Sequence, residues 1–154
     1  MSVAAIRVRG GVRVRGDIAD TLRMLRLHRP NHCVVLPPQE TYLGMLQKAK
    51  DYITWGEVDG EVLTQLLAAR GRRVGGKPLT EAHVKEMGYA SMPALAEAVL
   101  GGEADLQRLG DVKPVFRLSP PRKGYEGVKR SFRNGGALGD RGAAINELLL
   151  RMMG

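Results

Sequence analysis

The residues AAIRVRGGVRVRGDIADTLRMLRLHRPNHCVVL, at positions 4–36, contain the two periodicities that decide the fold. Residues 4–9 alternate between two kinds of side chain, which predicts a half-buried strand. Its inner face would carry Ile6, and its second face would carry Arg7 and Arg9. Because mixed charges are commoner on an ordinary solvent-exposed strand, we expect this cationic face to serve a polyanion.

The sequence then changes to helical spacing and back again. A helix is predicted from Asp17, an N-capping residue type, to about Leu27, and Pro30 ends it. The apolar run 32–36 predicts a second, fully buried strand. Apolar residues at helical spacing predict a second helix over about 39–53, so the first part of the chain follows the order β-α-β-α.

The middle of the chain is predicted to be a helical insertion. Helices are expected over 59–69 and after the N-capping residues Thr80 and Ser91. A linker rich in Gly and Arg covers 70–79. The sheet needs a third strand, and the only good later candidate is 115–118.

Residues 116–142 form a basic, glycine-rich loop with seven Arg or Lys and two acidic side chains. The loop has few large apolar residues to bury, so we expect that water alone does not order it. A polyanion with regularly spaced phosphates would order it. A solvated, flexible surface loop is the alternative interpretation. Apolar residues at helical spacing then predict a docked C-terminal helix over 143–153.

The distribution of charge points to the same kind of partner. The formal net charge is +8. Residues 1–33 hold seven Arg and two Asp, whereas residues 34–115 hold nine basic and eleven acidic side chains. Two basic segments around a slightly acidic middle are expected if one face binds nucleic acid. Aromatic residues make up only 5% of the chain, which argues against binding single strands mainly by base stacking.

Catalytic and metal-binding motifs receive little support. Gly71–Lys77 has the spacing of a nucleotide-binding loop, but Pro78 replaces the Ser or Thr that would hold magnesium, and no strand precedes it. His28, His32 and Cys33 match no common zinc motif. We therefore expect no enzyme activity, no metal, no cofactor and no small-molecule substrate.

Cysteine content and hydropathy restrict the compartment. The single cysteine, Cys33, excludes an intramolecular disulfide and fits a reducing environment. No window approaches the length of an apolar membrane span, and no signal-peptide pattern begins the sequence. We expect a cytoplasmic protein without a membrane partner.

Several longer motifs, in a fixed order, carry a family resemblance. They are Arg7-x-Arg9-Gly10, the run from Asp17 to Cys33, Tyr42-x-Gly44-Met45-Leu46-x-Lys48, Trp55-Gly56-Glu57, the run from Phe116 to Gly124, Gly135-Gly136-x-Leu138-Gly139, and Ile145-Asn146-x-Leu148. Together they resemble the L-thirty family of large-subunit ribosomal proteins. The last two elements resemble its archaeal and eukaryotic branch, whose eukaryotic member is called L-seven.

The resemblance implies an α+β fold with a ferredoxin-like β-α-β-α-β core. On this basis residues 1–58 form the first part of the core, 59–112 a helical insertion before the third strand, 113–118 the last core strand, and 119–154 a basic RNA-binding extension with a C-terminal helix. All four parts belong to one structural domain.

The resemblance also implies a structural role in the large ribosomal subunit, bound to ribosomal RNA beside other ribosomal proteins. 5S RNA is a candidate neighbour. The side chains expected to contact RNA are Arg7, Arg9, Arg13, Arg15, Arg29, Arg117, Arg122, Lys123, Lys129, Arg130, Arg133 and Arg141.

A free-standing RNA-binding or RNA-remodelling factor with the same fold is the alternative function. Co-sedimentation with ribosomes at high salt distinguishes the two, because a core component stays bound while a transient factor is washed off. A nucleotide-dependent enzyme, the third class, would show magnesium-dependent nucleotide binding at Gly71–Lys77.

Overall fold

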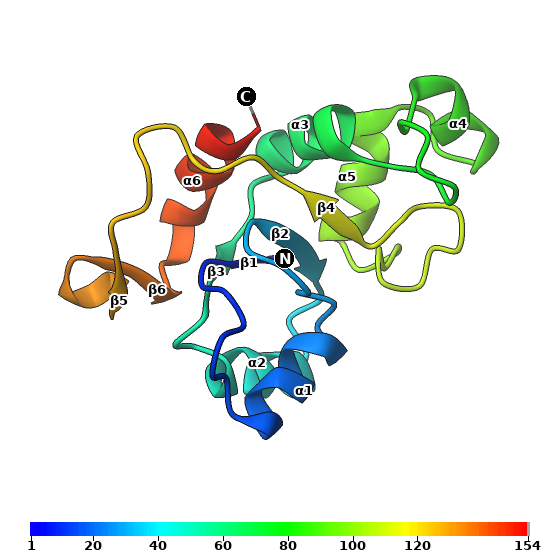
Figure 1. Ribbon diagram of the computed structural model, residues 1–154. Helices are drawn as coiled ribbons and strands as arrows, with labels where there is room; N and C mark the ends of the chain where they lie inside the picture. Colours follow the sequence, from blue (N-terminus) through cyan, green and yellow to red (C-terminus); the bar gives the residue numbers. More distant parts are fainter. Residues whose placement is uncertain (154) are drawn as a thin grey trace.

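The computed structural model describes residues 1–153, which form a six-stranded sheet with helices on both faces (Figure 1). The strand order is β4-β2-β1-β3-β6-β5. The fold is α+β with a ferredoxin-like core, as the sequence predicts. The core elements are β1 (Val3–Arg7), α1 (Gly16–Met24), β2 (His32–Leu36), α2 (Glu40–Lys48) and β3 (Ile53–Glu57).

The third core strand lies earlier in the chain than predicted. The helix expected over 39–53 ends at Lys48, and Ile53 begins β3, which pairs antiparallel with β1. The prediction failed because Leu46, Ala49 and Ile53 keep helical spacing and enter the same core cluster, although a turn separates the helix from the strand. Thr54 and Trp55, residue types that favour strands, mark the true element.

The predicted cationic face of the first strand is also wrong. β1 lies in the middle of the core sheet, antiparallel to both β2 and β3. Ala4 and Ile6 pack into one apolar cluster and Ala5 into the other, so both faces are buried. Arg7 is therefore only 6% exposed. Alternate residues of β1 therefore face two different apolar clusters, and neither set faces solvent. The side chain of Ala5 is small enough to pack against the second cluster.

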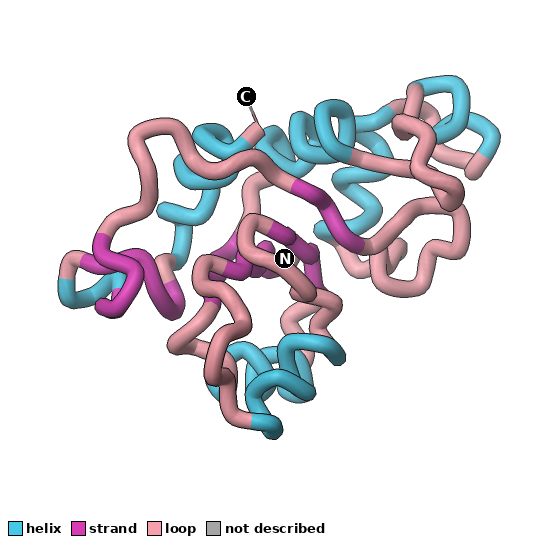
Figure 2. Tube along the Cα trace, viewed as in Figure 1, coloured by secondary structure: helices cyan, strands magenta, loops and turns pink. Residues whose placement is uncertain are grey.

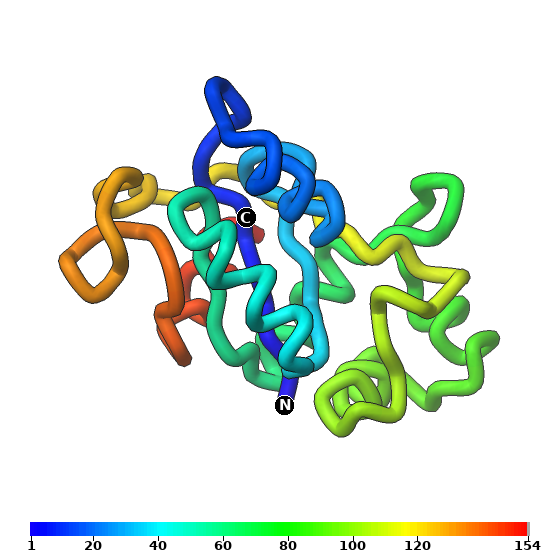
Figure 3. The backbone as a smooth tube through the Cα atoms, turned by 90° about the horizontal axis from the view of Figure 1, so that it is seen from below, coloured from blue at the N-terminus to red at the C-terminus, as the bar shows by residue number. Residues whose placement is uncertain are grey.

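The two layers of helices differ in origin. Figure 3 shows α1 and α2 in front of the sheet, whereas α3 (Gly60–Arg70), α5 (Met92–Leu100) and α6 (Ile145–Met152) cover the opposite face. The short α4 (Glu81–Glu86) packs beside α5. Thr80 and Ser91 cap α4 and α5 by accepting the backbone N–H of the residue three positions later, as predicted. The predicted apolar stripe of the last helix is buried as well: Ile145, Leu148, Leu149 and Met152.

The remaining strands lie at the two edges of the sheet (Figure 2). β4 (Val115–Arg117) pairs antiparallel with β2 at one edge, so a strand does form at the predicted place, but as an addition to a completed core. β6 (Gly136–Asp140) pairs parallel with β3, and β5 (Gly127–Ser131) pairs parallel with β6 at the other edge. Residues 127–140, which we call the basic arm, are thus a strand pair where a loop was predicted.

Two glycines explain how the arm and α6 fit against the core. A Cβ on Gly56 of β3 would lie 1.9 Å from the carbonyl oxygen of Gly142, just before α6. A Cβ on Gly136 would lie 2.1 Å from the carbonyl oxygen of Arg130. Both are far inside van der Waals contact, so only glycine permits this approach of neighbouring backbones.

Candidate nucleic-acid interface

One end of the sheet brings the two basic segments together. β1 ends there, β2 begins there and β4 ends there. The Arg7 carbonyl accepts the Asn31 N–H at 2.7 Å, and the Asn31 carbonyl accepts the Leu118 N–H at 3.1 Å. His32 of β2 lies opposite Arg117 of β4. Segments almost ninety residues apart in sequence therefore meet at one end of the sheet.

The basic residues at this end form the sheet-end cluster: His28, Arg29, His32 and Arg117. Its electrostatic effect is visible on His32. The pKa of His32 is lowered first by burial, and then by the positive charges of Arg117, His28, Arg29 and Arg7. Burial alone would lower this pKa, so only the further effect of the neighbouring basic residues indicates a positive potential, which suits an anionic ligand.

Arg7 supports this cluster from inside. Its Nη1 donates to the Leu27 carbonyl at 2.8 Å and its Nε to the Arg9 carbonyl at 2.9 Å. Burial lowers its pKa. The guanidinium thus joins the end of α1 to the loop after β1, and it offers little surface to a ligand.

The other basic residues of the first segment lie further out. Arg9 stacks over the Tyr52 ring at 5.1 Å and donates to the Asp51 carbonyl at 3.2 Å. Arg13 is exposed, with a φ of 59°. Arg15 is exposed as well, but it forms an ion pair with Asp17 at 2.7 Å.

A strap of residues 118–126 crosses the end of the sheet from β4 towards the basic arm (Figure 1). Two arginines hold the backbone of this strap and of the residue just before it. Arg70 donates to the Arg117 carbonyl at 2.7 Å, and Arg151 donates to the carbonyls of Arg122 and Gly124 at 3.1 Å. These bonds hold the backbone, so the side chains of Arg122 and Lys123 stay exposed.

The end of the strap is tied to the first basic segment. The Tyr125 hydroxyl donates to Asn31 Oδ1 at 2.6 Å, across 94 residues of sequence. Burial raises the pKa of this hydroxyl well above its usual range, so it remains a donor. Sequence reasoning missed Asn31, Arg70 and Arg151 as supports, because nothing local in the sequence marks a side chain that holds a distant backbone.

Arg141 anchors the basic arm in the same way that Arg7 anchors the first segment. It is 6% exposed. Its Nε donates to Thr54 Oγ1 at 2.9 Å, and its Nη2 donates to the Ala137 carbonyl at 2.9 Å and contacts Glu126 at 3.3 Å. Phe132 lies 4.8 Å below the guanidinium. Burial lowers the pKa of Arg141, while Glu126 acts in the opposite direction.

Three cations of the arm face solvent: Lys129, Arg130 and Arg133. Within residues 1–153, no carboxylate lies within 4.0 Å of their side-chain nitrogens. The same holds, among the residues described, for Arg9, Arg13, Arg29, Arg117, Arg122 and Lys123. Among the exposed residues that were predicted to contact RNA, only Arg15 therefore has an acidic partner in the described part of the chain.

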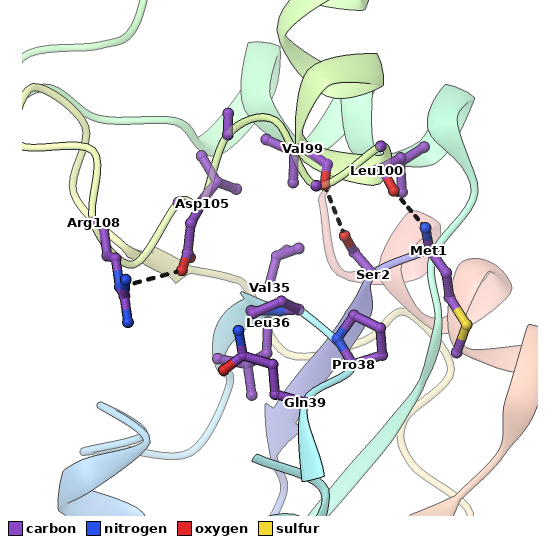
Figure 4. A pocket seen from close by; sticks show the side chains of 15 residues that line it. Met1, Ser2, Val35, Leu36, Pro38, Gln39, Val99, Leu100, Asp105 and Arg108 are labelled. Atoms are coloured by element: carbon purple, nitrogen blue, oxygen red, sulfur yellow. Dashed lines mark hydrogen bonds and ion pairs between the residues drawn. The ribbon is translucent and has the colours of Figure 1, made fainter. Parts of the chain in front are cut away.

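The opposite end of the sheet has a different character. A pocket of about 420 Å³ lies where β1 begins and β2 ends, between Pro38 and the end of α5 (Figure 4). Ser2 Oγ donates to the Val99 carbonyl at 3.2 Å there, and Asp105 pairs with Arg108 at 3.7 Å. Because its acidic and basic side chains pair with each other, this pocket offers no cationic surface comparable to that of the sheet-end cluster.

Other features of the described chain bear on the sequence-based expectations. No helix within residues 1–153 is long and apolar enough to cross a membrane. That same part of the chain holds no group of three or more His, Cys, Asp or Glu side chains able to ligate a metal. Cys33 is fully buried, and burial raises the pKa of its thiol far above the usual range.

Comparison with known proteins adds independent findings. A family model described as Ribosomal protein L30p/L7e matches residues 3–53. The large ribosomal subunit protein uL30 of Methanococcus vannielii is 55% identical over 155 residues, covering 99% of this chain and 100% of that protein. The uL30 proteins of Methanococcus maripaludis and Nanoarchaeum equitans are 54% and 53% identical, and cover 99% and 96% of the chain, and 100% and 96% of their own lengths.

Proposed function

The chain belongs to the ribosomal protein L30p/L7e family, and from this premise we propose that it binds ribosomal RNA through two basic segments as a structural part of the large ribosomal subunit. The first segment is the loop after β1 with Arg29. The second is the strap with the basic arm. Large-subunit ribosomal RNA and neighbouring ribosomal proteins are its partners, and 5S RNA is a candidate among the RNAs.

The observation that carries the proposal is the bridge at the end of the sheet. Asn31 hydrogen-bonds to Arg7, Leu118 and Tyr125, so one residue holds both basic segments in place. A rigid bridge fixes the spacing between two groups of exposed cations. A fixed spacing of cations suits a folded RNA, whose phosphates also have fixed positions.

The proposed mechanism is electrostatic and positional. Exposed Arg and Lys side chains contact phosphates, and the release of counterions from the RNA supplies much of the affinity. Arg122 can grip a phosphate with two hydrogen bonds or stack on a base, which a lysine cannot do. Arg7 and Arg141 are buried, so we assign them a positioning role rather than a contact with RNA.

Hydroxyl-radical footprinting on deproteinised large-subunit RNA tests the proposal. The wild-type protein should protect two stretches of RNA backbone that are close in the folded RNA. The variant Arg13→Gln with Arg29→Gln should lose one protected stretch, and the variant Lys129→Gln with Arg130→Gln should lose the other. A footprint that is unchanged by both double variants would contradict binding through these two segments.

A further inference from the structure

The segment after α3 is a hairpin placed among other cations. Arg72 pairs with Pro78 as an antiparallel bridge, and the Arg73 N–H donates to the Lys77 carbonyl at 2.7 Å. Gly75 and Gly76 make the turn with φ values of 98° and 90°. A helix precedes this segment, so its glycines form a β-turn and not the phosphate-binding loop that their spacing resembles.

The hairpin packs beside the strand that ends at the sheet-end cluster. The Lys113 N–H donates to the Arg72 carbonyl at 2.8 Å, and Arg73 pairs with Val112. These contacts bring a basic part of the insertion next to β4. They also create a pocket of about 230 Å³, lined by Arg70, Arg72, Gly76, Lys113, Val115 and Arg117.

The charge of this pocket is uniformly positive. Four of its six lining residues are cationic and none is acidic. Within residues 1–153, no carboxylate lies within 4.0 Å of any of the four side chains. Arg70 is engaged with the Arg117 carbonyl and Ser119 Oγ, at 2.7 and 2.8 Å. Arg72 uses its Nη1 to donate to the Gly71 carbonyl at 3.0 Å, which leaves its other donors for a ligand. Among the described residues, the side chains of Lys113 and Arg117 have no hydrogen-bond partner, so they can face a ligand.

The volume of the pocket fits one anionic group rather than an organic cofactor. It corresponds to about seven or eight water molecules at the volume each occupies in the liquid. A phosphate group with part of its hydration fits this space. Four cations around one concave site raise the local potential and attract such a group.

We propose that this pocket binds a backbone phosphate of the ribosomal RNA, and that the hairpin is a third RNA-binding segment. The inference rests on the proposed function, because the phosphate belongs to the same RNA. Arg117 belongs to both the sheet-end cluster and the pocket, so the RNA surface extends from the end of the sheet along β4 to the insertion. Sequence reasoning placed this segment in the net-acidic middle of the chain and assigned it no contact.

The test is a salt series of equilibrium binding to a large-subunit RNA fragment, with matched variants of the full chain. The pocket variant is Arg72→Gln with Lys113→Gln. The control is Lys85→Gln, an exposed lysine of α4 in the same insertion. The arm variant, Lys129→Gln with Arg130→Gln, reports on the proposed function independently.

The pocket variant should lower the slope of log affinity against log salt by about 0.9 for the one duplex phosphate that it no longer neutralises. Its loss of affinity should consequently be about 3.5-fold larger at 50 mM than at 200 mM salt. The Lys85→Gln variant should keep the wild-type slope. Cross-linking from a photoreactive residue at Val74, 66% exposed at the hairpin tip, should label the RNA.

The outcomes separate the inference from its premise. If the arm variant loses affinity but the pocket variant and the control match the wild type, the third segment is disproved and the proposed function stands. If neither the arm nor the pocket variant changes binding, the proposed function itself fails. A loss of affinity in the pocket variant with an unchanged salt slope would indicate altered folding, and would also overturn the pocket's role.

Discussion

The two basic segments carry similar charge but have very different supports. The first follows β1, a strand with both faces buried between two apolar clusters. The basic arm packs on a cluster whose buried members are only Val8, Ala137 and Leu138. Each segment is nevertheless held by one adjacent buried arginine, Arg7 or Arg141, which donates to backbone or side-chain oxygens. Charge alone therefore indicates where a polyanion binds, while the local core determines how rigidly the cations are held.

The largest effects should come from removing apolar volume, and they should differ between the two regions. Ile6 is completely buried in the larger cluster, so Ile6→Ala should lower the free energy of unfolding by about 3–4 kcal/mol. Leu138→Ala should lower it by about 2 kcal/mol, because the small cluster can relax. Urea unfolding followed by circular dichroism measures both. Equal losses would show that the arm is as firmly supported as the core.

The second comparison concerns the buried arginine of the arm. Arg141→Met keeps the apolar stem but removes the hydrogen bonds to Thr54 and Ala137, so the arm should lose about 2–3 kcal/mol of stability. Hydrogen exchange should report this loss in residues 127–140, while the amides of β1 and β2 keep their protection. Arg133→Met, on the exposed surface of the arm, is the control. Uniform loss of protection across the whole sheet would contradict a local anchoring role.

Sequence reasoning succeeded where local chemistry specifies structure. Thr80 and Ser91 cap helices as predicted, and the spacing of Ile145 and Leu148 identified the last helix. It failed at β3, because the helical spacing that ends at Ile53 continues through a turn. A local pattern describes one element at a time. Because Ile53 continues the apolar spacing of the preceding helix, the pattern gave no sign that a strand begins there.

The candidate interface shows the same difference between what local sequence reveals and what only the fold reveals. The position of the basic segments was visible in the sequence, but the burial of Arg7 and Arg141 was not, because a buried arginine and an exposed one look identical there. The bond between Tyr125 and Asn31 joins residues 94 positions apart, and only the folded chain brings them together. Which cations are available for RNA is therefore a property of the tertiary structure.

Removing the bond between the two segments should have a moderate effect. Tyr125→Phe deletes the hydroxyl that donates a hydrogen bond to Asn31 Oδ1. The substitution should lower the free energy of unfolding by about 1 kcal/mol. Since this bond links the strap to the first segment, exchange should accelerate in residues 118–126 before it does elsewhere. Tyr89→Phe provides a matched control, because among the described residues the Tyr89 hydroxyl has no hydrogen-bond partner. If both substitutions changed stability and exchange equally, the hydrogen bond between Tyr125 and Asn31 would not connect the two segments as described.

The smallest effect should be a dependence on pH at the sheet-end cluster. The folded chain holds the His32 proton less tightly than the unfolded chain, whose pKa is about 6.5. Stability from this residue is therefore present above that pH and decreases as the pH falls through the lower folded value. RNA phosphates favour protonated His32, so the affinity for RNA should rise as the pH falls over the same range. His32→Gln should flatten both profiles, and unchanged profiles in this variant would contradict the assignment.

The salt dependence of RNA binding tests the central claim most directly, because it counts the phosphates that each segment neutralises. Arg29→Gln and Arg130→Gln should each lower the slope of log affinity against log salt by about 0.9, and the double variant by about 1.8. Lys85→Gln, in the net-acidic middle, should leave the slope unchanged. If Lys85→Gln weakens binding as much as either of the other two substitutions, the binding is a nonspecific response to charge and the two-segment account is wrong.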